Sequence, residues 1–223
     1  MPVVITGDII NSSKLPLMHR QQRINDLFKG LFSTLRGVWG QSQQLRFEAI
    51  QGDAFQVYLP DDKDALRAAL LLKCYCLAQD KIDEMYRFDC RLSIATGPVS
   101  LLHPVLLAKS GGLVFDSSGR GLKGISPTGS QLVFASTEAT WTLAINMGLA
   151  LADEIIGRYT PAQSQAVLLK IMYPQQLQEW LANRLSISRS AYSQRLKQAG
   201  WIALKTLLSF YAATTPLQPH DTN

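Results

Sequence analysis

Cysteine is scarce in this chain, with only three among its 223 residues. Cys74 and Cys76 are near neighbours and Cys90 lies apart, so no Cys-x-x-Cys pair occurs. The odd number and this spacing do not fit a disulfide scaffold, a zinc site built on cysteine pairs or a thioredoxin-like motif. We therefore expect reduced thiols, as is usual in cytosolic proteins.

Long apolar runs and a signal peptide are also missing. No stretch approaches the roughly 18 apolar residues that a membrane-spanning helix needs. The first eight residues, MPVVITGD, lack a basic start and reach an acid after a few apolar residues. Hydrophobic residues make up 47% of the chain and charged residues 17%, which is typical of a globular protein. We predict a cytoplasmic protein with no membrane partner.

Positive charge is unevenly distributed. Residues 1–140 contain 15 basic and 13 acidic residues, whereas residues 158–211 contain seven basic residues and one acid, Glu179. A basic segment of this size is typical of contact with an anionic partner, most commonly nucleic acid. The alternative is a solvated helical surface with a chance excess of basic residues.

The hydrophobic pattern predicts an α+β fold with a mixed or antiparallel sheet. We expect strands at 3–6, 88–96 and 131–135, a hairpin at 46–59, helices at 21–39, 61–86 and 116–122, and only helices after residue 138. This order predicts a sheet domain over residues 1–138 and a helical domain over residues 139–213. Residues 214–223 are polar and contain proline, so we expect a disordered tail.

Two aspartates are candidates for binding a metal ion. Asp8 ends the first predicted strand and Asp53 lies in the turn of the hairpin. If these strands are neighbours, the two carboxylates meet at one edge of the sheet. Together with the backbone carbonyl of Ile9 and substrate phosphates, they form the oxygen ligand set that Mg²⁺ or Mn²⁺ takes. The alternative is ordinary turn chemistry, in which aspartate and glycine are favoured.

The loop after Asp8 supplies candidate phosphate-binding residues. Backbone N–H groups at the start of a helix bind phosphate, and basic side chains neutralise it. The candidates for binding a nucleotide cofactor are Asn11, Ser12, Ser13, Lys14 and Arg20.

Three segments resemble landmarks of the class III nucleotidyl cyclase catalytic fold. They are Gly7-Asp8-Ile9-Ile10-x-Ser12, Gln51-Gly52-Asp53-Ala54-Phe55 and the run from 91 to 99, RLSIATGPV. The resemblance implies a sandwich with a ferredoxin-like core, in which Asp8 and Asp53 bind two divalent metals over a purine nucleoside triphosphate. It also implies sites built across a dimer. Residues 115–122 are similar to the helix that stabilises the transition state, and Arg120 falls on its catalytic arginine.

Two positions depart from the cyclase pattern. Ala49 stands where that family selects the purine, with Glu48 one place away, and Asp116 stands where it has asparagine. An anion at position 116 repels a triphosphate. The departures favour binding of a nucleotide or metal over cyclisation. Over nearly its full length the chain resembles the SatD family of bacterial proteins, which implies a C-terminal helix-turn-helix.

The C-terminal segment contains the signals of such a motif. Thr160 and Pro161 begin one helix. A helix from Pro174 to about Leu185 is followed by a short polar break, after which Ser188 caps a helix that runs to Gly200. Helix, short turn and helix is the helix-turn-helix layout.

In that layout the second helix lies in the major groove and its first residues reach base edges. The candidates for contact with double-stranded DNA are Arg189, Ser190, Tyr192, Ser193, Gln194, Arg195 and Lys197. The Tyr192 ring is alternatively a packing residue. A homodimer that reads two half-sites is expected. A small helical bundle used for dimerisation is the alternative for the whole segment.

Our leading hypothesis is a bacterial DNA-binding transcriptional regulator whose cyclase-like domain senses a nucleotide or metal. One alternative is an active Mg²⁺- or Mn²⁺-dependent nucleotidyl cyclase or transferase that uses ATP or GTP, with Arg120 as a catalytic residue. Another alternative is a catalytically degenerate protein-interaction module.

Overall fold

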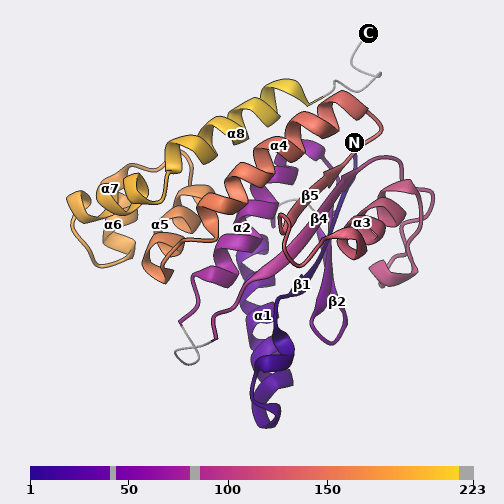
Figure 1. The fold of residues 1–223 in the computed structure, drawn as a ribbon, viewed down its shortest axis with the longest axis horizontal. Helices are drawn as coiled ribbons and strands as arrows, with labels where there is room; N and C mark the ends of the chain where they lie inside the picture. Colours follow the sequence, from indigo (N-terminus) through magenta and orange to yellow (C-terminus); the bar gives the residue numbers. More distant parts are fainter. Residues whose placement is uncertain (41–43, 81–85, 216–223) are drawn as a thin grey trace.

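The computed structural model describes residues 1–40, 44–80 and 86–215, and a five-stranded sheet lies at the centre of this part of the chain (Figure 1). Its strands are β1 (Val3–Ile9), β2 (Arg46–Gln51), β3 (Ala54–Leu59), β4 (Cys90–Thr96) and β5 (Leu132–Ala135), in the order β2-β3-β1-β4-β5. β1 is antiparallel to β3 and to β4, and β5 is parallel to β4. The predicted mixed sheet is confirmed.

Eight α-helices accompany the sheet in the described residues. They are α1 (Arg20–Trp39), α2 (Ala65–Leu77), α3 (Leu113–Gly124), α4 (Ala139–Ile156), α5 (Pro161–Met172), α6 (Gln178–Arg184), α7 (Arg189–Gln198) and α8 (Trp201–Thr214). The first six elements run β1-α1-β2-β3-α2-β4, which is the ferredoxin-like arrangement. Local sequence patterns favour these elements. β1 is rich in β-branched residues, which suit a strand, and α1 has its buried apolar residues at helical spacing.

The two faces of the sheet differ in how they are covered. Side chains alternate along a strand, so Val3 and Ile5 of β1 join a large apolar cluster with α1 and α2. Val4 belongs to a much smaller cluster with Val114 and Phe115 of α3. We refer to these as the α1–α2 face and the α3 face. The polar residues of β1, including Asp8, lie on the α3 face.

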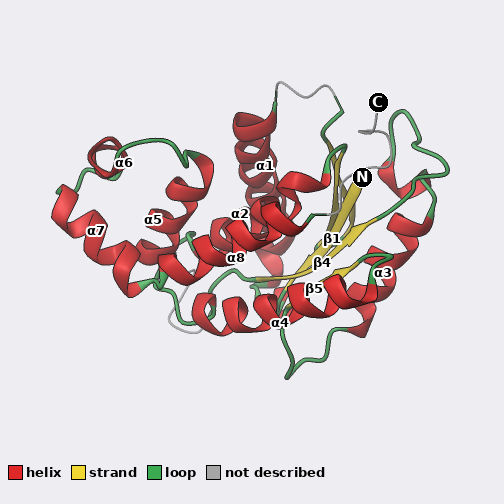
Figure 2. Ribbon diagram, turned by 90° about the horizontal axis from the view of Figure 1, so that it is seen from above, coloured by secondary structure: helices red, strands yellow, loops and turns green. Residues whose placement is uncertain are grey.

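The C-terminal helices share the core of the sheet. The large apolar cluster continues from α2 into α4, α5, α7 and α8. The buried hydroxyl of Tyr211 in α8 donates to the carbonyl of Asp62 just before α2, at 3.0 Å. The division at residue 138 stays a prediction, and buried contacts cross it. α6 and α7 lie at the end of the molecule farthest from α3 (Figure 2).

Some predicted bounds were wrong. The helix expected over 61–86 is a 3-10 turn at Asp62–Asp64 followed by α2, which ends at Leu77. After Leu77 and Ala78, the last buried residues of this helix, the sequence becomes polar. Residues 81–85 of the predicted range lie outside the described residues. α3 is longer than expected. In the predicted tail, Thr214 still belongs to α8, and 216–223 lie outside the described residues.

No helix in the described part of the chain is long and apolar enough to cross a membrane.

Candidate functional site

Asp8 lies on β1, and Asp53 lies in the hairpin turn just before the neighbouring strand β3. β1 pairs with β3 so that Asp8 is opposite Ala54, and the N–H of Ile9 donates to the carbonyl of Asp53 at 3.2 Å. Gly52, in the hairpin turn, has a φ of 63°, a conformation that glycine adopts without strain. The end of β1 and the β2–β3 turn therefore form one polar edge, which we call the aspartate edge.

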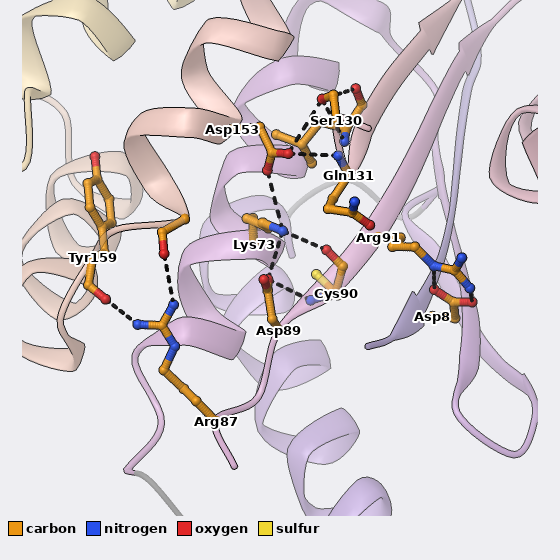
Figure 3. Close-up of polar contacts among 12 residues, drawn as sticks. Asp8, Lys73, Arg87, Asp89, Cys90, Arg91, Ser130, Gln131, Asp153 and Tyr159 are labelled. Carbon is orange, nitrogen blue, oxygen red and sulfur yellow. Dashed lines mark hydrogen bonds and ion pairs between the residues drawn. The ribbon is translucent and has the colours of Figure 1, made fainter. Parts of the chain in front are cut away.

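Each carboxylate of the aspartate edge already has a partner. The guanidinium of Arg91 binds Asp8 through two bonds, Nε to Oδ1 at 2.9 Å and Nη2 to Oδ2 (Figure 3). The Ser12 hydroxyl donates to Oδ2 of Asp53. The hydrogen bond to Asp8 is the main cause that raises the pKa of Arg91, and the charges of Asp8 and Asp53 add to it against the effect of burial. Arg91 is thus the direct partner of Asp8, and the charge of Asp53 also acts on it.

The Asp8–Arg91 pair is only partly buried. The side chain of Asp8 is 19% exposed and that of Arg91 is 32% exposed. Water and ligands therefore reach both groups. Sequence reasoning named Arg91 within a motif but assigned it no role, although an arginine directly opposite an aspartate on an adjacent strand is a favourable cross-strand pair once the register is known.

A second row of polar side chains lies beside this pair on the α3 face. Gln56 of β3 and Ser93 of β4 are both opposite Thr6 of β1. Gln56 donates to the Thr6 hydroxyl at 3.2 Å, and Thr6 donates to Ser118 of α3 at 2.9 Å. Within the described residues, Oε1 of Gln56 and Oγ of Ser93 are buried without a hydrogen-bond partner. Buried polar atoms normally have partners, so this face has unused hydrogen-bonding capacity.

Tyr86 borders the aspartate edge on another side. Its hydroxyl donates to the carbonyl of Ile10 at 3.4 Å. Burial raises the pKa of Tyr86 to about 12, and the charges of Cys76 and Asp53 contribute. The phenol is therefore neutral at physiological pH and acts as a hydrogen-bond donor. No sequence motif pointed to this residue.

The loop after β1 differs from the predicted phosphate cradle. Asn11 is left-handed, with a φ of 54°, and the N–H of Lys14 is already bonded to its carbonyl at 2.9 Å. The loop contains a 3-10 turn at Ser12–Lys14. A further 3-10 turn, Leu17–His19, separates the loop from α1, so the loop does not form the start of that helix. The first helix begins at Arg20, close to the predicted residue 21, and phosphate binding by the loop stays a prediction.

The predicted phosphate-binding side chains lie in different settings. Arg20 donates to the carbonyls of Ser13 and Leu15, and so holds the loop in shape. Lys14 and Ser13 are exposed. Of the five predicted residues, Ser12 is the one bonded to an aspartate of the edge.

Arg120 and Asp116 are exposed on the outer side of α3. Among the described residues, no hydrogen bond or ion pair joins either of them to the aspartate edge. A catalytic role of Arg120 stays a prediction.

The donor set of the aspartate edge fits a cation that arrives with phosphate. The described residues contain no group of three or more His, Cys, Asp or Glu side chains that could hold a metal ion together. Mg²⁺ is usually bound by one or two carboxylates, with water and substrate phosphates completing its shell. One carboxylate on β1 and one in the turn before β3 match that mode, whereas a metal bound by the protein alone needs more ligands than Asp8 and Asp53 provide.

The thiols take no part in such a site. Cys74, Cys76 and Cys90 are free and buried. Burial raises the pKa of Cys74 to about 12 and is the largest cause that raises the pKa of Cys90 well above its usual value. Thiolates are the metal-binding form, so Cys74 and Cys90 are neutral packing side chains at neutral pH.

Beside these cysteines, Lys73 of α2 is fully buried in a group of charges (Figure 3). Its ammonium lies 2.7 Å from Oδ1 of Asp89 and 3.5 Å from Oδ1 of Asp153, and it donates to the carbonyl of Cys90 at 2.9 Å. The N–H of Gln131 donates to Asp153 at 2.7 Å. Sequence reasoning missed this cluster because its members lie on α2, α4 and the segments before β4 and β5.

The helix α7 presents a polar surface. Ser188 caps it by accepting from the N–H of Ala191 at 3.1 Å, as predicted. The exposed residues on α7 include Arg189, Ser190, Ser193, Gln194 and Lys197, and Arg195 is half-buried. Tyr192 is instead fully buried, and its hydroxyl donates to the carbonyl of Ala166 at 2.9 Å. This corrects its place among the candidates for DNA contact, because its position on α7 points into the core.

No protein-family model and no curated protein matches this sequence. The SatD resemblance therefore stays a prediction.

Three solved structures are similar to this chain. One is the non-canonical dimeric guanylyl cyclase domain of the RhoGC fusion protein from the aquatic fungus Blastocladiella emersonii, with 18% identity, 63% of this chain and 80% of that chain covered, and a TM-score of 0.44. The guanylate cyclase domain of RhGC from Catenaria anguillulae in complex with GTP has 18% identity, 55% and 82% coverage, and a TM-score of 0.37. The catalytic core of a rhodopsin-guanylyl cyclase with converted specificity in complex with ATPalphaS has 19% identity, 55% and 81% coverage, and a TM-score of 0.36. At these identities the likeness concerns the fold alone.

Proposed function

We propose that this protein binds a nucleoside triphosphate together with Mg²⁺ or Mn²⁺ at the aspartate edge. The observation that supports this proposal is the pairing of β1 with β3, which brings Asp8 and Asp53 to one partly exposed edge beside Arg91. Two carboxylates and one guanidinium offer ligands for a cation and for phosphate oxygens at the same place.

Each residue of the edge has a distinct part in this binding. Asp8 and Asp53 hold the cation, which neutralises phosphate charge and orients the bound phosphates. Arg91 exchanges its bonds to Asp8 for bonds to a phosphate, which it binds in the same two-pronged geometry. Ser12, freed from Asp53, becomes available as a donor to phosphate. The exposed ammonium of Lys14 adds positive charge near the loop.

Binding has more support than turnover. Arg120 lies on the outer side of α3 and its helix neighbour Asp116 carries a negative charge. Within the described residues, no hydrogen bond or ion pair links Arg120 to the aspartate edge. Conversion of ATP or GTP requires a second subunit that brings its own Arg120 to the aspartate edge.

Calorimetric titration with ATP and with GTP, each in Mg²⁺ and in EDTA, tests the proposal. We expect saturable binding of at least one triphosphate in Mg²⁺, lost in EDTA and lost in Asp53→Asn. The matched control is Asp26→Asn, which removes an exposed carboxylate of α1. Equal affinity with and without the metal, or in Asp53→Asn, would contradict the proposal.

A second candidate function is binding of duplex DNA through α7. The observation that favours it is a group of exposed polar and basic side chains on α7, a helix that follows a short turn and is capped by Ser188. These residues are Arg189, Ser190, Ser193, Gln194 and Lys197. We expect the affinity for a mixed pool of duplexes to fall steeply with salt, and Lys197→Ala to lower the salt slope by about 1. Salt-independent binding, or none at low salt, would leave α7 as a surface for proteins only.

A further inference from the structure

A large cavity away from the aspartate edge lies where the sheet unit meets the C-terminal helices. It has a volume of about 510 Å³ and opens between the turn before α2, the end of α5 and the helix α8. Small-molecule sites commonly range from about 300 to 1,000 Å³. The cavity is therefore large enough for a ligand of mononucleotide size. We call it the lysine cavity.

The walls of the lysine cavity carry an excess of positive charge. Lys63, Arg67, Lys170 and Lys205 line it, with Asp64 as the acid among the lining residues. Asp64 pairs with Arg67 at 3.4 Å, and Arg67 also donates to the carbonyls at the end of α5. The lysine ammonium groups are thus left without an acidic partner in the described part of the chain.

The three lysines differ in how they are held. Lys170 donates to the carbonyls of Pro174 and Gln176, at 2.9 and 3.0 Å. These bonds fix its ammonium against the turn between α5 and α6. Lys63 and Lys205 make no side-chain hydrogen bond or ion pair with any described residue. Burial lowers the pKa of Lys170, and the positive charge of Lys205 lowers it further. Two like charges in one cavity repel each other, and an anion between them relieves that repulsion.

The rest of the wall is mainly apolar, with Gln175 and Ser209 as its polar members. Trp201 and Leu208 of α8 and Ile171 of α5 line the cavity beside the lysines. A purely inorganic ion leaves this wall in contact with water. A ligand that carries both an anionic group and an apolar or aromatic part matches the whole cavity.

We propose that the lysine cavity binds a small organic phosphate, with the phosphate among Lys63, Lys170 and Lys205 and the apolar or aromatic part against Trp201 and Leu208. Lysine ammonium groups act as mobile point charges toward phosphate. The site needs neither the metal nor the aspartate edge, so it stands or falls independently of the proposed triphosphate binding.

Binding at this place joins two parts of the chain. Lys63 precedes α2, whereas Lys170 and Lys205 belong to the C-terminal helices. A ligand that holds all three favours the docked arrangement, and the melting temperature rises with the logarithm of ligand concentration once that concentration exceeds the Kd. The lysine cavity thus offers a means by which a metabolite stabilises the junction between the sheet and the helices.

The test is a titration of the full chain with AMP, ribose 5-phosphate and inorganic phosphate in EDTA, which silences the metal-dependent site. Calorimetry gives the affinity, and the melting temperature gives an independent signal. We expect saturable AMP binding that is at least tenfold weaker in Lys205→Glu and in Lys63→Glu, two exposed positions. Lys29→Glu, on the exposed side of α1, is the matched control and keeps the affinity.

Three results would overturn the proposal. The first is no saturable binding of AMP or ribose 5-phosphate. The second is an affinity unchanged in both lysine variants when circular dichroism shows that they are folded. The third is displacement of AMP by a short DNA duplex at equal phosphate concentration, which would assign the cavity to the nucleic-acid backbone.

Discussion

The two faces of the sheet hold charged groups in opposite ways. On the α1–α2 face, Lys73 is 1% exposed and faces Asp89 and Asp153, whose side chains are 25% and 12% exposed. On the α3 face, Asp8 and Arg91 form a pair that solvent reaches from the sheet edge. A buried charge has no alternative partner, whereas a partly exposed one can exchange its partner for water or a ligand. The Lys73 cluster therefore stabilises the fold, whereas the Asp8–Arg91 pair can exchange partners and bind a ligand.

The pKa of Lys73 illustrates the first case. Burial is the largest influence and lowers it, yet the charges of Asp89, Cys90 and Asp153 together raise it overall. A raised pKa in the folded state means that this group stabilises the fold fully below the unfolded value of about 10.4. That stability is lost as the pH rises through the higher folded value. Neutral solutions leave the cluster intact.

The largest expected effect is that of Lys73→Met. The substitution leaves Asp89 and Asp153 facing each other with no cation, and breaking a buried pair in this way costs about 3–5 kcal/mol. Urea denaturation followed by circular dichroism measures the free energy of unfolding. Lys29→Met is the control, with an expected change of about 0.5 kcal/mol or less. A loss below about 1 kcal/mol for Lys73→Met would show that the cluster is not a structural element.

A smaller effect is expected from glycines of α3, the helix that covers the α3 face. A Cβ at Gly121 would lie inside contact distance of the Ser93 hydroxyl, so Gly121→Ala must displace the Ser93 side chain or move α3 away from β4. Such overpacking costs about 1–3 kcal/mol. Gly119 lies in the same helix with open space around it, so Gly119→Ala stabilises by up to about 1 kcal/mol. Opposite signs in thermal unfolding confirm the close packing, and equal signs contradict it.

Asp8→Asn sharpens the comparison from the other side. It removes a partly exposed ion pair, so we expect a stability loss of about 1 kcal/mol. We also expect it to abolish the metal-dependent binding of a triphosphate, because asparagine carries no charge for the cation. Calorimetric titration and urea denaturation on the same sample measure both effects. A loss as large as that of Lys73→Met would place Asp8 among the structural charges.

The smallest expected effect is an absence of reaction. The thiol of Cys74 has its pKa raised to about 12 by burial, and all three cysteines are enclosed. At pH 8 we expect none of them to react with a colorimetric disulfide reagent over an hour in native protein. All three react after guanidinium unfolding, which is the internal control. A fast-reacting native thiol would show that the α1–α2 face opens.

Local signals carried most of the fold prediction. The periodic apolar residues of α1, the Gly-Asp turn between β2 and β3, and the caps Thr160 and Ser188 each act over a few residues, and the structure contains all of them. The end of α2 was missed because no strong stop signal follows Leu77. Helical pattern alone does not fix where packing ends.

The sequence predicts only the part of the candidate site that depends on the pairing of β1 with the hairpin. The meeting of Asp8 and Asp53 follows from pairing of β1 with the hairpin. Arg91 as the partner of Asp8 requires the register between β1 and β4, which the sequence does not show. From the sequence, Tyr192 is a candidate both for DNA contact and for packing. Its place on the buried side of α7 depends on how α5 packs. Tertiary contacts decided these cases.

The hydrogen bond from Tyr211 to the residue just before α2, and the continuous core around it, have a consequence for how such a chain can change over time. A sensor and an output part joined by a loose linker can be exchanged between proteins like separate components. Here the last helix completes the interior of the first unit, so deletion or exchange of the C-terminal helices exposes α2 and β5. The sheet and the C-terminal helices therefore need each other to complete one core.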